Sequence, residues 1–489
     1  MIFRTGKRGW FSFIFIPVCF FFINGCLREK FTPPVRIETF YPDDVAAIIT
    51  TKCAVSGCHN PSSYQLAGNL DFSTHGKMFN GNNLGAVVIP FRPDQSPLLF
   101  YVNVDSTLGI VQQPAMPVNS TPLSRSEYFT LRNWIYIGAP DKNGNDPFAD
   151  NPFRKKFYVA NSGCDLLSVF DSEKKVIMRC YDLGTQSGII EASSEIKFTP
   201  DGKYYLIDFL NSDKLQVFDA STDNMVTSIT IGSPGNNGWG QIAISGDSKT
   251  AYVASSSGNI VFVDIASAAV TNTVYIAASL HALELNPAGD TLFAALDPGN
   301  YLYKIPVHNS TAFLSFNLHS LIPQPTALNI HDIIFISADR FALTCAHANQ
   351  LWIMDANTVS LIDTFHTGAT PQQLAISDSY PYLFITCENS PAFSGTQGSV
   401  EVYNYLSLTR IKTIKAGIQP NAIAVDDHFK LAYVANRNTG VSGHGSHHAS
   451  TCGGGKQNGD LTFINLETLE TLPQKPELSV DPRALAIRP

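Results

Sequence analysis

Two cysteines and a histidine lie within seven residues in the run Cys53-Ala54-Val55-Ser56-Gly57-Cys58-His59. Two thiols followed directly by an imidazole can attach a c-type haem, because the thiols add to the vinyl groups and the histidine becomes the proximal iron ligand. The usual spacing places two residues between the cysteines, whereas this chain has four. The motif therefore predicts covalent haem c at Cys53, Cys58 and His59, and needs support from elsewhere in the chain.

A methionine between two prolines supplies that support. Met116 lies in the run Gln113-Pro114-Ala115-Met116-Pro117, 116 − 59 = 57 residues beyond His59. A thioether held in a proline-flanked loop is suited to be the sixth ligand of a haem iron. His75 and Met78 are rivals closer to the motif, but Met78 has no flanking prolines.

A helix must follow this loop. Ser124 is a suitable N-cap, Leu131, Trp134 and Ile135 continue an apolar periodicity, and Gly138-Ala139-Pro140 ends it. With these three motifs in order, residues 41–142 resemble the bacterial class I cytochrome c domains that use a Cys-x4-Cys-His site and a Met-Pro axial loop. The resemblance implies a small all-α cytochrome c domain. The alternatives are a disulfide between Cys53 and Cys58, or a zinc knuckle, to which only His75 could add a fourth ligand.

The N-terminus has the pattern of an export signal. A basic stretch with Arg4, Lys7 and Arg8 precedes a 14-residue apolar run over 10–23, which is short for a membrane span. Gly25-Cys26 follows at once and resembles the lipobox of bacterial lipoproteins. The resemblance implies a signal peptide over 1–25, lipidation of Cys26, a tether over 26–40, and anchoring to the bacterial membrane, facing the periplasm or the cell surface. A plain signal peptide and an uncleaved anchor are the alternatives.

Composition narrows the class of protein further. The chain has 489 residues, which indicates two or more domains, and its formal charge of −8 argues against nucleic acid as a partner.

Nine cysteines are present. Cys19 lies in the expected signal peptide, Cys26 is the expected lipidation site, and Cys53 and Cys58 belong to the haem motif. An odd set of five remains with its pairing open, and Cys345 and Cys387 are expected to be packed thiols; the set is Cys164, Cys180, Cys345, Cys387 and Cys452.

Beyond a turn-rich linker at 143–152, one sequence repeat recurs over 153–489. Its clearest copies are the runs at 157–161, 251–255 and 432–436, each containing Tyr-Val-Ala, and each is followed by a strand that ends in aspartate or a similar residue. A repeat of about 40–50 residues with four strands is typical of a β-propeller blade. The motif Tyr-Val-Ala-Asn resembles the YVTN family of propeller repeats.

The register of the repeat predicts how the ring closes. The first unit begins on its second strand, and the chain ends on a first strand without a successor, at 483–489. Seven first strands match seven second strands only if the C-terminal strand completes the first blade. The fold expected is therefore multidomain, with the cytochrome c domain followed by an all-β seven-bladed propeller closed by its C-terminal strand, which leaves no exposed sheet edge.

Two histidines are expected at one mouth of this ring. Alignment of the inner strands places seven residues there, namely Ser194, Gly240, His281, His331, Gln372, Asn421 and Arg483. An insertion at 443–459 should lie on the same side and contains His444, His447, His448 and Cys452. Imidazole and thiolate suit a second metal such as copper. Its ligands would come from His281 and His331 together with the three histidines and the cysteine of the insertion. A chance placement of His281 and His331, and a glycine-rich flexible loop, are the alternatives.

Three functions fit these observations. The first is an exported electron-transfer protein with a propeller that docks a redox partner or ligand. The second is an oxidoreductase with an active site at the propeller mouth and the haem as electron relay. The third is a binding propeller with an accessory haem. The sequence predicts one haem site and only a conjectural second cofactor site, so electron transfer is the function favoured.

Overall fold

The computed structural model describes residues 38–186, 188–233, 238–321, 327–439, 452 and 457–489. The predicted signal peptide, Cys26, His444, His447 and His448 lie outside these residues. Residues Thr39–Pro489 form one compact unit. None of the helices within the described ranges is long and apolar enough to span a bilayer.

Residues 39–150 contain nearly all of the helices, and most are short. The α-helices are α1 (Asp43–Ile48), α2 (His75–Met78), α3 (Pro97–Val102) and α4 (Arg125–Tyr136). A π-helix follows α1 at Ile49–Cys53, and 3-10 turns occupy Tyr64–Leu66, Pro93–Gln95 and Ser106–Leu108, with a further one in the propeller at Leu318–Ser320. Their apolar side chains pack into a single core that contains Ile49, Leu131 and Ile135, all fully buried.

The predicted helix after the methionine loop is α4. Ser124 caps it, because its Oγ accepts a hydrogen bond from the Glu127 backbone N–H and the Glu127 carboxylate accepts one from the Ser124 N–H. Lys52 donates a hydrogen bond to the same carboxylate at 3.0 Å, which ties α4 to the end of the π-helix. Gly138 ends the helix at a φ of +108°, where a Cβ would meet the ring of Phe91 at 2.6 Å.

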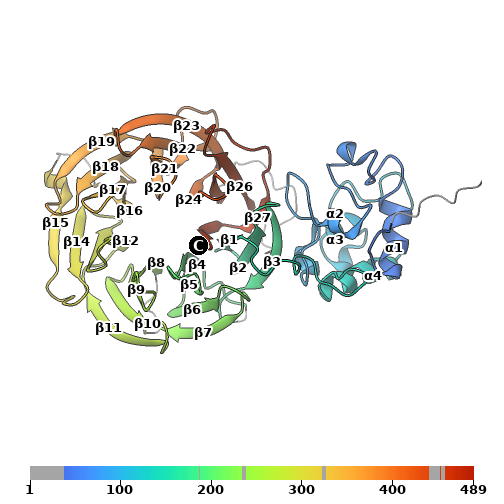
Figure 1. Ribbon diagram of the computed structural model, residues 1–489, viewed down its shortest axis with the longest axis horizontal. Helices are drawn as coiled ribbons and strands as arrows, with labels where there is room; N and C mark the ends of the chain where they lie inside the picture. The colour runs from blue at the N-terminus through green and yellow to red at the C-terminus, as the bar shows by residue number, and fades with distance from the viewer. Residues whose placement is uncertain (1–37, 187, 234–237, 322–326, 440–451, 453–456) are drawn as a thin grey trace, which may run out of the picture. The chain divides into compact units, whose positions relative to one another are not determined.

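Residues 156–487 form seven four-stranded antiparallel sheets arranged in a ring (Figure 1). The first blades contain β1 (Lys156–Asn161), β2 (Leu166–Asp171) and β3 (Val176–Asp182); β4 (Ser193–Phe198), β5 (Tyr204–Phe209), β6 (Lys214–Asp219) and β7 (Met225–Thr230); β8 (Trp239–Ile244), β9 (Thr250–Ser255), β10 (Asn259–Asp264) and β11 (Ala269–Tyr275); and β12 (Leu280–Leu285), β13 (Thr291–Leu296), β14 (Tyr301–Pro306) and β15 (Leu314–Asn317). The others contain β16 (Ile330–Phe335), β17 (Arg340–Cys345), β18 (Gln350–Asp355) and β19 (Leu361–His366); β20 (Ala369–Ile376), β21 (Tyr382–Asn389), β22 (Gln397–Asn404) and β23 (Thr409–Ile418); and β24 (Pro420–Asp426), β25 (Leu431–Asn436), β26 (Asn458–Asn465) and β27 (Glu477–Val480). The last strand, β28 (Pro482–Ile487), belongs to the first blade.

The C-terminal strand closes the ring, as the repeat register predicts. β28 pairs antiparallel with β1, with Phe157 opposite Ile487 and Val159 opposite Leu485. The first blade therefore has the order β28-β1-β2-β3 and combines both ends of the propeller sequence. The seven-bladed propeller with C-terminal closure is confirmed.

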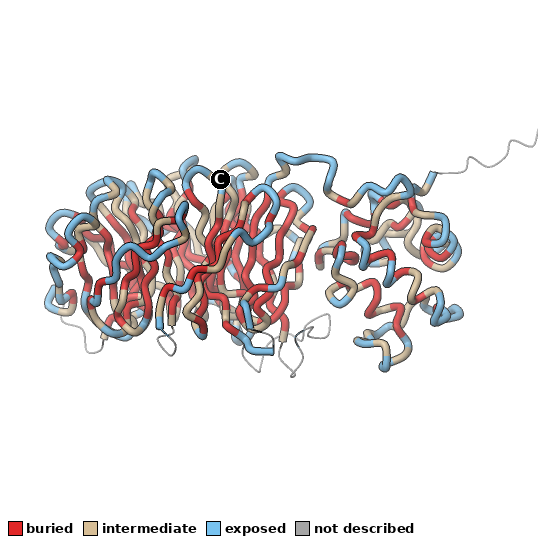
Figure 2. The backbone as a smooth tube through the Cα atoms, turned by 90° about the horizontal axis from the view of Figure 1, so that it is seen from below, coloured by how far each residue is buried: buried red, intermediate tan, exposed pale blue. Residues whose placement is uncertain are grey.

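The Tyr-Val-Ala motif is apolar throughout, as expected for second strands, because neighbouring blades cover both of their faces. All six residues of β1 are buried, and so are all six of β25. Phe157 lies between Phe170 of its own blade and Tyr433 of the neighbouring blade, with ring centroids 4.5 Å from each. Figure 2 shows the buried residues running along the strands and the exposed ones at the turns.

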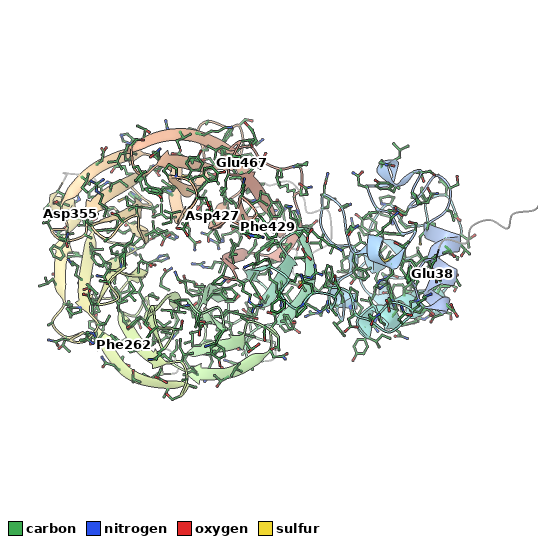
Figure 3. The ribbon with its side chains drawn as sticks, in the orientation of Figure 1. Glu38, Phe262, Asp355, Asp427, Phe429 and Glu467 are labelled. Atoms are coloured by element: carbon green, nitrogen blue, oxygen red, sulfur yellow. A yellow bond between two sulfur atoms is a disulfide. The ribbon has the colours of Figure 1, made fainter. Side chains whose placement is uncertain are left out.

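The aspartates at the ends of third strands close the following turn. The Asp355 carboxylate, labelled in Figure 3, accepts hydrogen bonds from the backbone N–H groups of Asn357 and Thr358. Asp171 and Asp264 accept from the residue three positions on in the same way. An aspartate that bonds to the backbone just ahead of it favours a turn, which explains why Val-Phe-Asp recurs.

Candidate functional sites

One apolar cavity brings together the four residues expected to bind haem. Cys53, Cys58, His59 and Met116 all line a cavity of about 470 Å³ in the helical segment. Other walls are apolar and include Leu70, Phe72, Leu98 and Val102. The volume lies within the range of about 300–1,000 Å³ that is usual for ligand and cofactor pockets.

The motif itself forms a tight loop that follows the π-helix. The His59 backbone N–H donates to the Cys53 carbonyl at 3.1 Å, so the four-residue spacer folds back on itself. Asn60 donates from its side chain to the Val55 carbonyl at 2.6 Å, and Ser63 from its hydroxyl to the Cys58 carbonyl at 2.7 Å. These bonds hold both cysteines and the histidine against the same cavity despite the longer spacing.

The imidazole of His59 is fixed in a defined tautomer. Its Nδ1 lies 3.1 Å from the Leu70 carbonyl oxygen, to which it must donate a proton, so Nε2 retains the lone pair that a metal needs. The ring stacks on Phe72 with centroids 4.6 Å apart. Burial lowers the pKa of His59, which keeps the imidazole neutral.

Met116 is held by the backbone of α3, and its rivals lie elsewhere. The Met116 N–H donates to the Tyr101 carbonyl at 2.8 Å. Met78 is buried in the core at 1% exposure and does not line the cavity. His75 donates from Nε2 to the Ala139 carbonyl at 2.8 Å and packs against Tyr41 and Trp134, also away from the cavity.

The alternatives for the cysteine motif gain no support from this geometry. Cys53 and Cys58 are both free thiols, not a disulfide. Burial, with a smaller contribution from Cys58, raises the pKa of Cys53 to about 12. A zinc knuckle would need His75, whose imidazole is bonded to Ala139. The donor set and the apolar walls therefore fit a c-type haem better than they fit zinc.

The second set of predicted ligands is brought together only in part. His281 of β12 and His331 of β16 come from adjacent blades, and their ring centroids lie 4.2 Å apart. Both are the extra residue of a β-bulge: pairing shifts between Leu280 and Ala282, and again between Ile330 and Asp332. A bulge turns one side chain out of the regular alternation, and bulges often adjoin functional sites. The two histidines predicted at the mouth therefore lie side by side, whereas most of the 443–459 insertion expected beside them lies outside the described residues.

A third residue, missed in the sequence, completes this cluster. Asp297 follows β13, and its Oδ2 lies 3.1 Å from Nδ1 of His331. The corresponding positions after other second strands include Ser162, Ala346 and a second carboxylate, Glu388, so Asp297 does not stand out from the repeat in the sequence. Among the described residues, His281, Asp297 and His331 are the one group of three or more potential ligands that could hold a metal ion.

The electrostatics of the cluster favour a neutral His281. Burial lowers the pKa of His281 to about 3, and the neighbouring His331 and Arg483 act in the same direction. Burial raises the pKa of Asp297, but the hydrogen bond from His331 and the charges of the nearby histidines together lower that pKa overall. The cluster therefore holds a carboxylate beside a neutral imidazole.

Cys452 does not belong to this cluster, contrary to the prediction. It forms a disulfide with Cys164, with Cα atoms 5.7 Å apart, so its sulfur is not available as a thiolate. Cys164 follows β1, in the connection between the second and third strands of its blade, and Cys452 lies in the corresponding connection between β25 and β26. Cys180, Cys345 and Cys387 are buried free thiols, as expected for Cys345 and Cys387.

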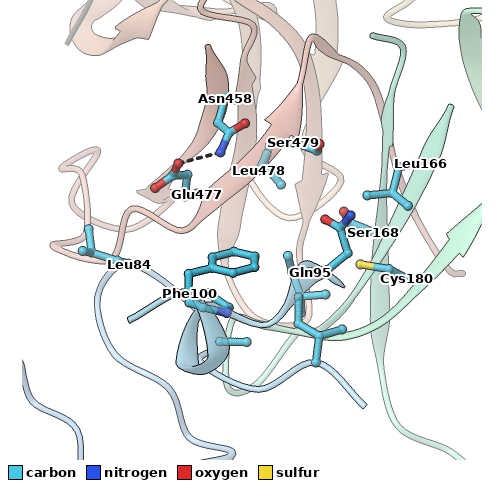
Figure 4. A pocket seen from close by; sticks show the side chains of 14 residues that line it. Leu84, Gln95, Phe100, Leu166, Ser168, Cys180, Asn458, Glu477, Leu478 and Ser479 are labelled. Carbon is cyan, nitrogen blue, oxygen red and sulfur yellow. Dashed lines mark hydrogen bonds between the residues drawn. The ribbon is translucent and has the colours of Figure 1, made fainter. Parts of the chain in front are cut away.

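A small cavity of about 50 Å³ lies where the helical segment meets β2, β3 and β27 (Figure 4). Leu84, Ala86 and Pro97 line both this cavity and the larger one that contains Met116. The Glu477 N–H of β27 donates to the Leu84 carbonyl at 3.0 Å, and the Glu477 side chain accepts from Asn458 at 2.8 Å. One layer of residues thus separates the larger cavity from the propeller strands.

The sequence matches no protein-family model and no curated protein. Similar solved structures include a functionally unknown protein from Desulfotomaculum acetoxidans DSM 771, 12% identical with a TM-score of 0.50, over 68% of this chain and 98% of that one. Hydrazine synthase of Kuenenia stuttgartiensis is 12% identical with a TM-score of 0.47, over 62% and 92%. Dihydro-heme d1 dehydrogenase NirN in complex with DHE is 13% identical with a TM-score of 0.47, over 91% of this chain and 98% of that one. At such identities the likeness concerns the fold alone, and the shared architecture is all that it establishes for this chain.

Proposed function

We propose that residues 41–142 are a cytochrome c domain with one covalent haem c, and that the chain is an exported electron-transfer protein. Cys53 and Cys58 would form the thioethers, and His59 and Met116 would be the axial ligands. The convergence of these four side chains on one apolar cavity is the observation that carries the proposal. A haem held in this way supplies reversible one-electron chemistry without a substrate of its own.

The chain's own residues would orient and shield that group. The Leu70 carbonyl fixes His59 with Nε2 available, and the Tyr101 carbonyl anchors the methionine loop. Phe72 and Leu98 contribute to the apolar walls, which limit the access of water to the site.

The propeller in this proposal is a platform that docks a protein redox partner or another ligand. The expected export and lipid anchor at Cys26 agree with the haem, because c-type haem is attached outside the cytoplasm. Membrane association would then come from the lipid and not from a spanning segment.

Covalent attachment is the direct test. Thioether bonds survive denaturation, whereas a haem that is only ligated is lost, so the denatured full chain should keep its haem on an acid gel. A Cys53→Ser, Cys58→Ser double variant should lose it, and a Cys345→Ser variant, which alters a buried propeller thiol, should not. Loss of haem from the wild-type chain, or its retention in the double variant, would contradict the proposal.

A further inference from the structure

We propose that His281, Asp297 and His331 form a binding site for a divalent first-row metal ion at the mouth of the propeller. The site shares no residue with the proposed haem cavity, so it stands or falls independently of the haem. Two imidazoles and one carboxylate are a common set of three protein ligands for such ions, and they leave a coordination position open.

The hydrogen bonds leave one ligand atom free and hold the other two side by side. Nδ1 of His281 donates to the His331 carbonyl at 3.0 Å, so its Nε2 carries the lone pair. Nδ1 of His331 donates to Asp297 Oδ2 at 3.1 Å, a separation that also suits two atoms bound to one ion once the proton has moved from Nδ1 to Nε2 or to solvent. All three ligand atoms lie within 4.8 Å of one another. Ligand atoms at about 2.0–2.2 Å from a tetrahedral ion are about 3.3–3.6 Å apart, so the separations here would have to shorten by up to about 1.5 Å, which side-chain rotation can supply.

The backbone holds the three residues in place. His281 and His331 occupy equivalent bulges of adjacent inner strands, and the Asp297 N–H donates to the Ser279 carbonyl at 3.0 Å. Residues on paired strands are positioned more rigidly than residues on loops, which lowers the cost of assembling a site.

Ligand type and charge narrow the choice of ion. With Cys452 in a disulfide, the cluster offers nitrogen and oxygen but no thiolate, which favours Zn²⁺ or another borderline divalent ion over Cu⁺. Asp297 and the nearby Asp332 would offset the charge of the ion, whereas Arg483 would oppose it.

The test uses the full-length protein, first dialysed against a chelator. Equilibrium dialysis with Zn²⁺ should show one tightly bound ion per chain beyond any haem iron. His281→Gln and His331→Gln should each weaken binding by roughly 100-fold or more, and Asp297→Asn by roughly 10-fold or more. His366→Gln, at an exposed position on β19, is the matched control and should leave binding unchanged.

Two further measurements keep the outcome decisive. A variant with His444, His447 and His448 replaced by alanine should retain the ion. In the wild-type chain, Zn²⁺ should protect His281 and His331 from modification by diethyl pyrocarbonate, which needs no variant to fold. The proposal is overturned if the wild-type chain binds no stoichiometric Zn²⁺, if binding is lost with the 444–448 histidines instead, or if neither ring is protected.

Discussion

Met116 and Met78 differ in what surrounds their sulfur atoms. Met116 lines the cavity with His59, whereas Met78 is packed in the core and is fully buried. If the cavity holds haem, methionine ligation gives a low-spin iron and raises the reduction potential relative to two histidines. The sixth ligand is therefore a property that a single substitution can assign.

Met116→Ala should abolish the weak near-infrared sulfur-to-iron charge-transfer band and lower the potential of the haem. Met78→Ala is the matched control: it should keep the band and instead lower stability by about 2–5 kcal/mol, because it leaves a cavity in the core. Near-infrared spectroscopy of the oxidised protein measures the band. Its loss in Met78→Ala with retention in Met116→Ala would reverse the assignment.

At the scale of single residues, the sequence predicted which side chains share the apolar cavity better than which side chains share the propeller mouth. Cys53, Cys58, His59 and Met116 are recognisable because their types and order belong to one short-range chemical pattern. Asp297 lies in a hairpin and meets His331 only through the contact of two blades, which no spacing along the chain reveals. The sequence favours a metal-binding role for Cys452 because it lies close to three histidines. Its disulfide partner, Cys164, is 288 residues away, so the sequence gives no sign of the pairing.

Inner strands are linked to one another by partly buried carboxylates as well as by apolar packing. Glu195 of β4 accepts a hydrogen bond from the Ile242 N–H of β8 at 2.7 Å, and Asp332 of β16 accepts one from the Leu374 N–H of β20 at 2.8 Å. Burial raises the pKa of Glu195 to about 8 and that of Asp332 to about 6. Each carboxyl group therefore binds its proton more tightly in the folded protein than in the unfolded chain.

This linkage sets the direction of a pH effect. A group whose pKa is raised by folding contributes stability that is complete below its unfolded pKa and is lost as the pH rises through the folded value. For Glu195 the window runs from about 4.5 to about 8, so stability should fall across it. Folding lowers the pKa of His281, so this residue makes stability rise with pH up to about 6.5 and opposes the effect of Glu195 there. The contribution of Glu195 is therefore measured more clearly between pH 6.5 and 8.

Glu195→Gln keeps an oxygen that can accept from Ile242 but cannot ionise. The variant should therefore show a flatter decline in melting temperature between pH 6.5 and 8 than the wild-type protein. Glu467→Gln, at an exposed turn labelled in Figure 3, should follow the wild-type curve. Parallel curves for wild type and Glu195→Gln would contradict the assignment of the effect to this carboxyl group.

Closure is the property that belongs to the molecule as a whole. The ring is complete only when β28 pairs with β1, and the Cys164–Cys452 disulfide links the first blade to the connection between β25 and β26 of the last. Both connections join the first and last blades, across the point where the ring closes. The sequence predicted the first from the strand register, but not the second, because cysteine pairing depends on which loops meet.

A Cys164→Ser, Cys452→Ser variant should be less stable by about 2–5 kcal/mol, because a long loop in the unfolded chain is no longer constrained. Denaturant unfolding followed by propeller tryptophan fluorescence measures this difference. Reducing agent should lower wild-type stability to the level of the variant and leave the variant unchanged. Equal stability of oxidised wild type and variant would show that the bridge contributes nothing to closure.

The pairing of β28 with β1 also separates two folding events. The first residues of the two strands lie 482 − 156 = 326 positions apart in the sequence, and β1 has no inner neighbour until β28 pairs with it. The core of the helical segment, in contrast, is built only from residues 41–148. After export, the helical segment can therefore fold and acquire any group that it binds without waiting for the first blade to receive its last strand.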